Sequence, residues 1–422
     1  MKVIVIGSGL IGVSTAYALR RFGHAVTVID RQEGPGRETS FANGSLLTPS
    51  MPEPWNAPGC WRVLLASVGR SDSALQLRLQ ALPSLAGWGL TFLRNSAPAN
   101  FERNTLKNLR LAAYSLQVME SLRRETDLEY GRSAAGTLRV FRDAAALERS
   151  VAAAHRLSSE GITFRKLSGA ETAELEPALA PIAGSLAGSI HSDIDETGNA
   201  HRFCAALTDR ARAAGVEFRF GTNVHSLEMR SGEVSAVQSS DGKLIADRYI
   251  VAAGSYSTPL LRRIGVALPV RPAKGYSLTF DRPLSEPSLR IPVVDDDLHA
   301  VIVPLEGMIR VAGTAEFIGY DLTLPAARIR NLLRLPQRVL PQAALDPAIA
   351  RPWCGLRPMS ADGVPIIGGT PIPNLLVNSG HGHLGWTMAA GSGQLLADLM
   401  SGASPAIDPD AYALSRFATA RP

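Results

Sequence analysis

Three glycines near the amino terminus are the residues best suited to binding a phosphate. Gly7, Gly9 and Gly12 directly follow an apolar, β-branched run at residues 2–6. The first glycine of such a triplet permits a sharp turn, the second lets the backbone approach a pyrophosphate, and the third lets the next helix pack on the strand. The pyrophosphate then lies at the positive N-terminal end of that helix. We therefore predict a dinucleotide site in this segment.

An acid completes the pattern. Asp30 closes a second apolar run at residues 25–29 and lies eighteen residues beyond Gly12. A carboxylate in this position accepts hydrogen bonds from a ribose hydroxyl. Strand, glycines, helix, strand and acid occur in the required order, which makes an unrelated glycine-rich turn the weaker interpretation. An acid rather than a base disfavours NADP, and the choice between FAD and NAD depends on the rest of the chain.

A second glycine-rich loop lies near the other end of the chain. Gly380, Gly382 and Gly385 precede an apolar segment, residues 387–400, that we predict to be helical. A helix N-terminus carries partial positive charge and free N–H groups. Directed at the pyrimidine edge of a flavin, it would stabilise the negative charge that grows there as the ring accepts a hydride. An ordinary glycine-rich loop is the alternative.

Arg357 is the residue best suited to an anionic substrate. It follows Gly355-Leu356 and precedes a proline. A guanidinium binds a carboxylate through two parallel hydrogen bonds and keeps its charge in an apolar pocket. A structural salt bridge is the alternative. We interpret His381 and His383 as loop histidines without a role in proton transfer.

Composition excludes several classes of function. The chain has 422 residues, of which 45% are hydrophobic and 19% charged, with a net charge of +5. The basic residues are scattered, so a nucleic-acid partner is not expected. Three distant cysteines, none in a CxxC pair, predict neither a disulfide framework nor a metal site. The sequence does not indicate an oligomeric state.

The order of strand patterns predicts the fold class. Continuous apolar runs, typical of buried parallel strands, occur at the start, near 215–254 and near 375–400, whereas alternating runs occur at 136–193 and 270–312. We predict an α/β (α+β overall) protein in which a Rossmann-like nucleotide-binding domain is interleaved with an antiparallel-sheet substrate-binding domain. The predicted nucleotide-binding segments are residues 1–60, 195–268 and 351–418, and the substrate-binding segments are residues 61–194 and 269–350.

Two apolar stretches raise the question of a membrane. Residues 60–68 contain Trp61 and residues 82–93 contain Trp88, and both stretches are too short to span a bilayer. Packing on the protein's own core is the favoured interpretation, and an interfacial patch is the alternative. The dinucleotide pattern accounts for the apolar amino terminus, so we expect no signal peptide and a cytoplasmic location, with peripheral contact to the cytoplasmic membrane face as the alternative.

The chain resembles the D-amino-acid dehydrogenase branch of the FAD-dependent amino-acid oxidoreductases over nearly its whole length. The motifs that carry the resemblance are VIGSGLIGVSTAYAL, ETSFAN, DETGNAHRF, RPAKGYSLT, GLRPMSADGVPIIG and GHGHLGWTMAAGSGQLLADLM. Two places depart from the family pattern: Asn43-Gly44-Ser45, and His383, where a small residue is more usual.

The resemblance implies a cofactor and a reaction. The cofactor is non-covalent FAD, since no cysteine or histidine lies in a flavin-linking context. A D-amino acid loses a hydride from Cα to flavin N5, and the imino acid hydrolyses to a 2-oxo acid and ammonia. The electrons pass to a quinone or another respiratory carrier. Alternatives are oxidation of D-hydroxyproline or another cyclic imino acid, transfer of electrons to oxygen, and a non-catalytic flavin relay.

The resemblance also assigns residues. Arg357 holds the substrate carboxylate, and Tyr276, on a strand that lies over the flavin, assists through its hydroxyl. On sequence alone, a core aromatic is the strong alternative for Tyr276. The cofactor-binding residues are Gly7, Gly9, Leu10, Ile11, Gly12, Asp30, Arg31, Ser40, Asn43, Gly44, Val224, Gly254, Gly382, Gly385, Trp386 and Thr387. For Ser40 and Asn43, simple turn chemistry is the alternative.

Overall fold

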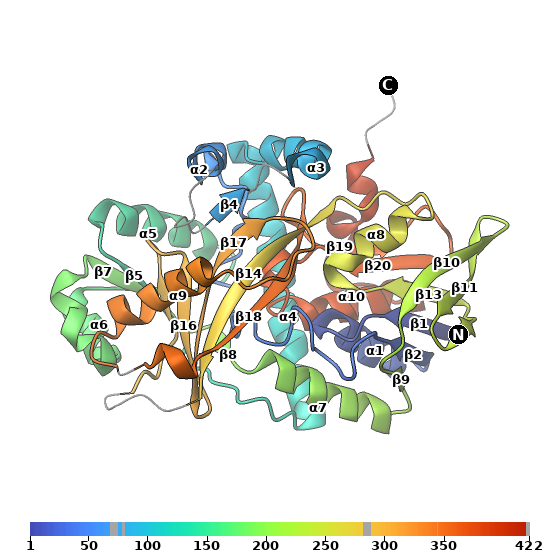
Figure 1. The fold of residues 1–422 in the computed structure, drawn as a ribbon, viewed down its shortest axis with the longest axis horizontal. Coiled ribbons are helices and arrows are strands. Elements are labelled where there is room, and N and C mark those ends of the chain that lie inside the picture. Colours follow the sequence, from blue (N-terminus) through green and yellow to red (C-terminus); the bar gives the residue numbers. More distant parts are fainter. Residues whose placement is uncertain (68–74, 78–80, 282–287, 344, 419–422) are drawn as a thin grey trace.

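Two large sheets lie side by side in the computed structural model, which describes residues 1–67, 75–77, 81–281, 288–343 and 345–418. Figure 1 shows the mostly antiparallel sheet on the left and the mostly parallel sheet on the right, with the amino terminus at the right-hand edge. The predicted α/β class with a Rossmann-like part and an antiparallel part is confirmed.

The six-stranded sheet is assembled from the start, the middle and the end of the chain. Its strand order is β19-β20-β13-β1-β2-β9, and every neighbouring pair is parallel except β19 with β20. The strands are β1 (Lys2–Ile6), β2 (Ala25–Ile29), β9 (Glu217–Arg219), β13 (Arg248–Val251), β19 (Ile366–Gly369) and β20 (Leu375–Ser379).

Both faces of this sheet are covered, which explains the continuous apolar run of β1. Val3 and Val5 pack toward the helices α1 and α10, whereas Ile4 and Ile6 pack toward β10, β11 and α8 on the opposite face. Successive side chains of a strand point to opposite faces, so both sets must be apolar. The covering elements are α1 (Leu10–Arg21), α7 (Ala200–Ala213), α8 (Ser257–Arg262), α10 (Ala389–Ser401), β10 (Val224–Arg230), β11 (Glu233–Ser239) and β12 (Gly242–Leu244).

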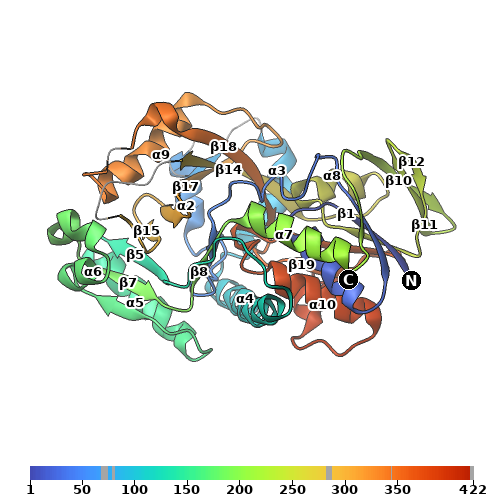
Figure 2. The same cartoon turned by 90° about the horizontal axis from the view of Figure 1, so that it is seen from below.

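The nine-stranded sheet forms the other half of the molecule. Its order is β18-β14-β17-β16-β15-β5-β7-β6, with β4 added beside β17. The strands are β4 (Leu75–Leu77), β5 (Thr137–Phe141), β6 (Arg165–Leu167), β7 (Gly188–Ser192), β14 (Val270–Phe280), β15 (Val293–Asp295), β16 (Ala300–Leu305), β17 (Met308–Phe317) and β18 (Arg351–Ser360). The helix α9 (Ala326–Val339) packs its apolar side on this sheet, and Figure 2 shows it above β14 and β17.

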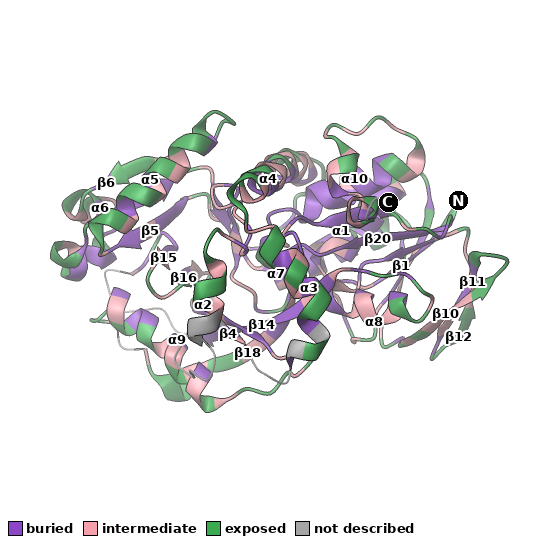
Figure 3. Cartoon of the chain, turned by 90° about the horizontal axis from the view of Figure 1, so that it is seen from above, coloured by how far each residue is buried: buried purple, intermediate pink, exposed green. Residues whose placement is uncertain are grey.

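The remaining elements surround these two layers. They are the helices α2 (Cys60–Ser67), α3 (Leu82–Arg94), α4 (Pro98–Thr126), α5 (Ala144–Ser158) and α6 (Gly169–Leu175), the short strands β3 (Leu46–Leu47) and β8 (Glu196–Thr197), and the 3-10 turns η2 (Pro177–Ser185), η3 (Gly254–Tyr256), η4 (Pro347–Ile349), η5 (Gly382–Leu384), η6 (Pro409–Tyr412) and η7 (Leu414–Phe417). In Figure 3 the inner strands are buried, while α5 and α6 carry exposed residues.

The predicted boundaries of the two domains differ from the pairing at two places. β18 was expected with the nucleotide-binding segments, yet it pairs with β14 from Val270–Ser360 to Thr279–Arg351 and so belongs to the nine-stranded sheet. α4 was expected with the substrate-binding segments, yet it packs against α10 through the contact of Ser115 with Gly391. In both cases long-range packing, which sequence patterns do not report, decides the position.

The two tryptophan-containing stretches form α2 and α3. Trp88 is buried against Phe92 and Phe317, and its indole N–H donates to the carbonyl of Met359 at 3.1 Å, as the favoured interpretation predicts. Trp61 differs, since 48% of its surface is exposed. Within the described part of the chain, no helix has both the length and the apolar character needed to cross a membrane.

Candidate active site

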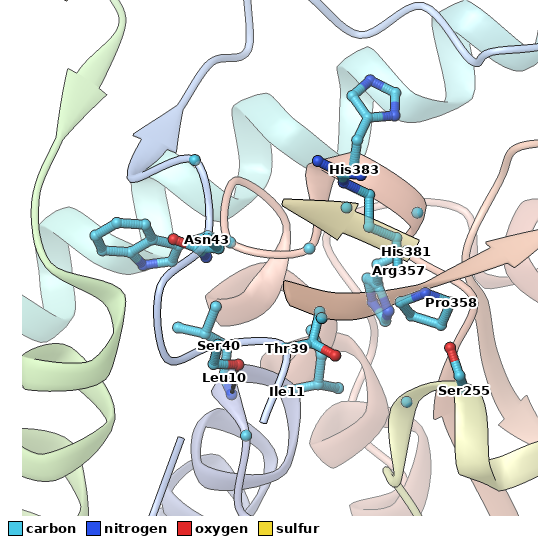
Figure 4. A pocket seen from close by; sticks show the side chains of 18 of the residues that line it. Leu10, Ile11, Thr39, Ser40, Asn43, Ser255, Arg357, Pro358, His381 and His383 are labelled. Carbon is cyan, nitrogen blue, oxygen red and sulfur yellow. Dashed lines mark hydrogen bonds between the residues drawn. The ribbon is translucent and has the colours of Figure 1, made fainter. Parts of the chain in front are cut away.

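One cavity of about 910 Å³ joins the two sheets. One end is lined by the residues that follow β1 and β2, including Gly9 and Asp30, and the other end is lined by Arg357, Trp55 and His383. Figure 4 shows this arrangement, with Leu10 and Ile11 at one side of the view and His383 at the other. Most of the residues predicted to bind cofactor or substrate therefore share one cavity.

The glycine triplet occupies the turn from β1 into α1. Gly7 has a φ of 109°, and a Cβ there would lie 2.6 Å from the carbonyl oxygen of Ala252. A Cβ on Gly12 would lie 1.9 Å from the carbonyl oxygen of Gly7. These two positions accept only glycine, because helix and strand approach too closely for a side chain. Gly12 does not line the cavity, and its function is this packing.

The N-terminus of α1 is open to the cavity. Gly9 is its N-cap and makes no side-chain hydrogen bond, and the first turn contains no acid. The N–H of Leu10 donates to the hydroxyl of Ser40 at 3.2 Å, and Ile11 also lines the cavity. A helix end with free N–H groups and no compensating acid suits a diphosphate.

Asp30 lies at the end of β2 and is already part of a local network. One carboxylate oxygen accepts from the N–H and the hydroxyl of Ser8, both at 2.7 Å, and the other accepts from the N–H of Gln32 at 2.9 Å. A carboxylate has about four acceptor positions, so capacity remains for a ribose hydroxyl. These bonds hold the carboxylate at the cavity wall, and the ribose contact itself stays a prediction.

Arg31 stacks on an aromatic ring that the sequence analysis did not single out. Its guanidinium carbon lies 4.0 Å from the ring centroid of Tyr256, and its charge pairs with Glu38. Val224 and Gly254 line the same end of the cavity. A flat, cationic wall of this kind suits an adenine ring. A tyrosine two residues after the glycine that ends a buried strand is the only signal that could have found Tyr256.

The loop after Asp30 is shaped by turn chemistry. The side-chain oxygen of Asn43 accepts from the N–H of Ser45 at 3.0 Å, which is the alternative that the sequence left open. Asn43 and Gly44 line the cavity, and Ser45 has a φ of 56°. Ser40 and Asn43 thus shape this wall with bonds to the protein itself.

The second glycine-rich loop forms the wall opposite. Gly380 and Gly382 have φ values of 83° and 57°, and Gly382, Gly385 and Trp386 line the cavity. The indole N–H of Trp386 is buried and has no hydrogen-bond partner among the described residues. We predicted that the helix after this loop begins at Thr387, but α10 begins at Ala389. Thr387 does not line the cavity, and its hydroxyl accepts from the N–H of Thr48 at 3.0 Å and so fixes the neighbouring chain.

Arg357 projects from β18 into the far end of the cavity. One of its nitrogens donates to the carbonyl of Thr314 at 3.2 Å, and no carboxylate of the described residues lies within 4.0 Å of it. Burial lowers its pKa to about 10, which leaves it protonated at neutral pH. A Cβ on Gly275 would lie 2.0 Å from the guanidinium, so glycine makes room for it. An enclosed cation without an acid is suited to an anionic ligand.

Tyr276 reaches the cavity wall but not with a free hydroxyl. The hydroxyl donates to the buried carboxylate of Glu316, which also accepts from Arg328 at 2.9 Å. Burial and this carboxylate raise the pKa of Tyr276 far above its ordinary value. The expected hydroxyl contact with a substrate carboxylate does not fit this geometry, because an acid already uses the donor and would repel a second anion. Of the two interpretations of Tyr276, a substrate contact or a core aromatic, the geometry favours the core aromatic.

Trp55 and His383 line the cavity next to Arg357. Their rings stack with centroids 5.4 Å apart, and the guanidinium carbon of Arg357 lies 5.4 Å from the indole of Trp55. Residues 51–59 carry three prolines, and an aromatic residue in such an irregular segment is the only sequence signal for Trp55. His381 behaves as expected for a loop histidine, since it bonds Ser392 at 2.9 Å and burial lowers its pKa to about 3.

An enzyme that holds a dinucleotide beside a small anionic substrate is the class of protein that this fold and cavity define. The open helix end, the glycine cradle and the unpartnered indole N–H of Trp386 fit FAD. The chain belongs to the FAD-dependent oxidoreductase family, whose model matches residues 2–399.

Relatives match over the whole length. A protein named D-amino acid dehydrogenase from Paramagnetospirillum magneticum is 42% identical over 418 residues, covering 99% of each chain. A protein of the same name from Allorhizobium ampelinum is 41% identical and covers 100% of each chain. The crystal structure of glycine oxidase from Geobacillus kaustophilus has a TM-score of 0.75 at 23% identity, with 98% of each chain covered, and supports the fold.

Proposed function

We propose that this protein oxidises D-amino acids to 2-oxo acids and ammonia, using FAD. The observation that carries the proposal is the enclosed guanidinium of Arg357, which has no carboxylate partner among the described residues and faces the cavity that begins at the dinucleotide turn. The two relatives named D-amino acid dehydrogenase support the choice of substrate. An electron relay without substrate has no use for such a cation, which disfavours that alternative.

The chain's own residues bind and orient the reactants. Arg357 would hold the α-carboxylate and so fix Cα, while the N-terminus of α1 would hold the diphosphate of the cofactor. The loop at Gly382 and Gly385 lines the cavity and would offer backbone N–H groups to the flavin, where such donors stabilise negative charge. When bound, FAD supplies at N5 the acceptor for the hydride that leaves Cα. The imino acid that results hydrolyses in water.

We propose that the FAD is non-covalent. None of the three cysteines, Cys60, Cys204 and Cys354, lines the cavity. Acid precipitation of the purified yellow protein should release FAD quantitatively, and flavin that stays with the protein pellet would contradict this.

Electrons should leave to a quinone at the cytoplasmic membrane face. Trp61, Leu90 and Leu93 on α2 and α3 expose 48%, 64% and 41% of their surfaces, and Arg62 lies beside Trp61. Exposed aromatic and aliphatic side chains next to a cation suit a headgroup region. Reduced enzyme should be reoxidised faster by a soluble ubiquinone analogue than by oxygen, and the protein should sediment with anionic vesicles. Faster reoxidation by oxygen would identify an oxidase instead.

Anaerobic bleaching of the flavin tests the proposal. The purified protein is mixed without oxygen with a panel of D-amino acids, their L-enantiomers and cyclic imino acids such as D-hydroxyproline, and the flavin absorbance is followed. We expect bleaching by D-amino acids and none by the L-enantiomers. Bleaching by cyclic imino acids alone would favour that second substrate class, and no bleaching by any member would contradict the proposal.

A further inference from the structure

His383 shares one aromatic ring with the cation that binds the substrate. Its imidazole stacks on Trp55 with an interplanar angle of 20°, and the guanidinium of Arg357 lies over the same indole. Figure 4 shows Arg357 and His383 at the same end of the cavity. The three side chains come from residues 51–59, from β18 and from η5, and all three line the cavity.

The imidazole of His383 is neutral and its ring nitrogens are available. Neither nitrogen makes a hydrogen bond with a described residue, and the side chain lies inside the molecule but borders the open space of the cavity. Burial and the nearby charge of Arg357 lower its pKa to about 3. A neutral imidazole has one nitrogen that accepts a hydrogen bond. The substrate end therefore combines a fixed cation with a neutral acceptor.

One acid lies close in sequence to Trp55. Glu53 lines the cavity, but the charges that act on its carboxylate are those of Arg139 and Arg156. His381, in the same loop as His383, is bonded to Ser392. Among the described residues, His383 is thus the acceptor that shares Trp55 with Arg357.

The chemistry of the substrate needs such an acceptor. The amino group of an amino acid is bonded to the carbon next to the carboxylate, so fixing the carboxylate on Arg357 leaves the nitrogen a few ångströms away. Hydride can leave Cα only when nitrogen has a free electron pair, that is, as a neutral amine. An ammonium would add a second positive charge beside Arg357, which a neutral acceptor does not offset.

We propose that His383 accepts a hydrogen bond from the substrate's α-amino group and, with Arg357, favours the neutral amine. This rests on the proposed function, because it assumes that Arg357 holds an α-carboxylate. His383 is then a specificity-determining residue for α-amino acids as opposed to simple carboxylates, and its stack on Trp55 sets the orientation of the acceptor.

Two substitutions separate the acceptor from the stack. His383→Phe keeps an aromatic ring on Trp55 and removes the acceptor, whereas His383→Asn keeps an acceptor and removes the stack. His155→Phe is the matched control, because His155 is an exposed histidine of α5 outside the cavity. The flavin spectrum verifies that each variant retains its cofactor.

The measurement compares an amino acid with its deaminated analogue. kcat/KM is determined for D-alanine, or for the D-amino acid that bleaches the wild type fastest, and Kd for propionate is determined from its perturbation of the flavin spectrum. His383→Phe should lower kcat/KM about tenfold, the loss of one hydrogen bond, and change Kd for propionate less than twofold. His383→Asn should recover part of kcat/KM, and His155→Phe should match the wild type.

Two results would overturn the inference: an unchanged kcat/KM in His383→Phe, or an equal loss of propionate binding. Each is distinct from failure of the proposed function, in which the wild type itself is not bleached by any D-amino acid.

Discussion

The two ends of the cavity are built in different ways. At the dinucleotide end, the site is formed mainly by a turn of the backbone. Gly7 and Gly12 are required because a Cβ would collide with the carbonyls of Ala252 and Gly7, and Gly9 leaves the N-terminus of α1 without a side-chain cap. At the substrate end, the site is formed by side chains. Trp55, Arg357 and His383 come from three separate segments of the chain and contact one another. The first end is a local motif, and the second exists only in the folded protein.

This difference predicts which properties a substitution separates. A change at the dinucleotide end should abolish cofactor retention and with it every activity. A change at the substrate end should leave the flavin bound and alter only what the enzyme does with particular substrates. The predictions below are arranged by the size of the expected effect.

The largest effect is expected at Gly9. Gly9→Val places a branched side chain where the diphosphate must lie, with Ser40 already 3.2 Å from the Cβ position, so retention of FAD should be lost completely. The flavin-to-protein ratio after gel filtration measures this. Gly184→Val is the control, since Gly184 has open space around it and an ordinary backbone conformation. A folded Gly9→Val protein with stoichiometric FAD would refute the dinucleotide assignment.

The next effect concerns Arg357. Arg357→Ala should cost about 2–5 kcal/mol of transition-state stabilisation, because a charge-assisted bidentate contact is lost. This corresponds to a fall in kcat/KM on the order of 30- to 5,000-fold. Arg357→Lys should recover only part, since an ammonium does not present two parallel donors. Both variants should remain yellow. Steady-state kinetics with the best D-amino acid gives the comparison, and loss of flavin from both variants would show that the two ends are not independent.

Tyr276→Phe tests whether this residue binds substrate or supports the fold. Removing the hydroxyl leaves the buried carboxylate of Glu316 one donor short, so the free energy of unfolding should fall by about 1–3 kcal/mol. Because the hydroxyl is occupied, kcat/KM should change less than threefold. Urea unfolding and steady-state kinetics on the same preparation distinguish substrate binding from support of the fold. A large fall in kcat/KM without a fall in the free energy of unfolding would show that Tyr276 binds the substrate, as the family resemblance implies.

The smallest expected effect is a change in the pH dependence of stability caused by the carboxyl group of Asp195. It accepts hydrogen bonds from Ser50 and Thr137 and so ties the segment that carries Trp55 to β5. Burial raises its pKa to about 6, against the hydrogen bonds that lower it. Because this lies above the pKa of an unfolded aspartate, its contribution to stability is greatest below about pH 4 and is lost as pH rises through about 6.

Asp195→Asn removes that titration. Between pH 5 and pH 7.5 the wild type should lose about 1–2 kcal/mol of unfolding free energy that the variant does not lose. Urea unfolding of both proteins at the two pH values gives the difference. Parallel stability curves would show that Asp195 does not titrate in this window.

The sequence was informative where structure is local. The turn at Gly7, the helix end at Gly9 and the acid at Asp30 follow from spacing alone, because a strand, a turn and a helix that are adjacent in sequence are adjacent in space. Gly307 is a local signal of the same kind, since a glycine within an alternating run favours the hairpin that joins β16 to β17. The family resemblance assigned Thr387 to the cofactor site, but its hydroxyl accepts a hydrogen bond from the N–H of Thr48.

Long-range packing accounts for what sequence reasoning missed. Trp55 lies in an irregular segment whose position is set by Asp195 and Asn108, far away in the chain. The membership of β18 in the nine-stranded sheet depends on pairing with β14, and the partner of the Tyr276 hydroxyl, Glu316, lies on a neighbouring strand. None of these contacts has a signature in local composition or periodicity.

The most direct test of the central claim, that Arg357 binds the substrate carboxylate, uses two kinds of substrate on two proteins. Anaerobic flavin reduction is measured for the wild type and for Arg357→Ala, with a D-amino acid and with the matching amine that lacks the carboxylate. The amine should be a poor substrate of the wild type and should lose little further in the variant, whereas the amino acid should lose on the order of 30- to 5,000-fold. An equal proportional loss for both substrates would contradict the account and identify Arg357 as a structural residue.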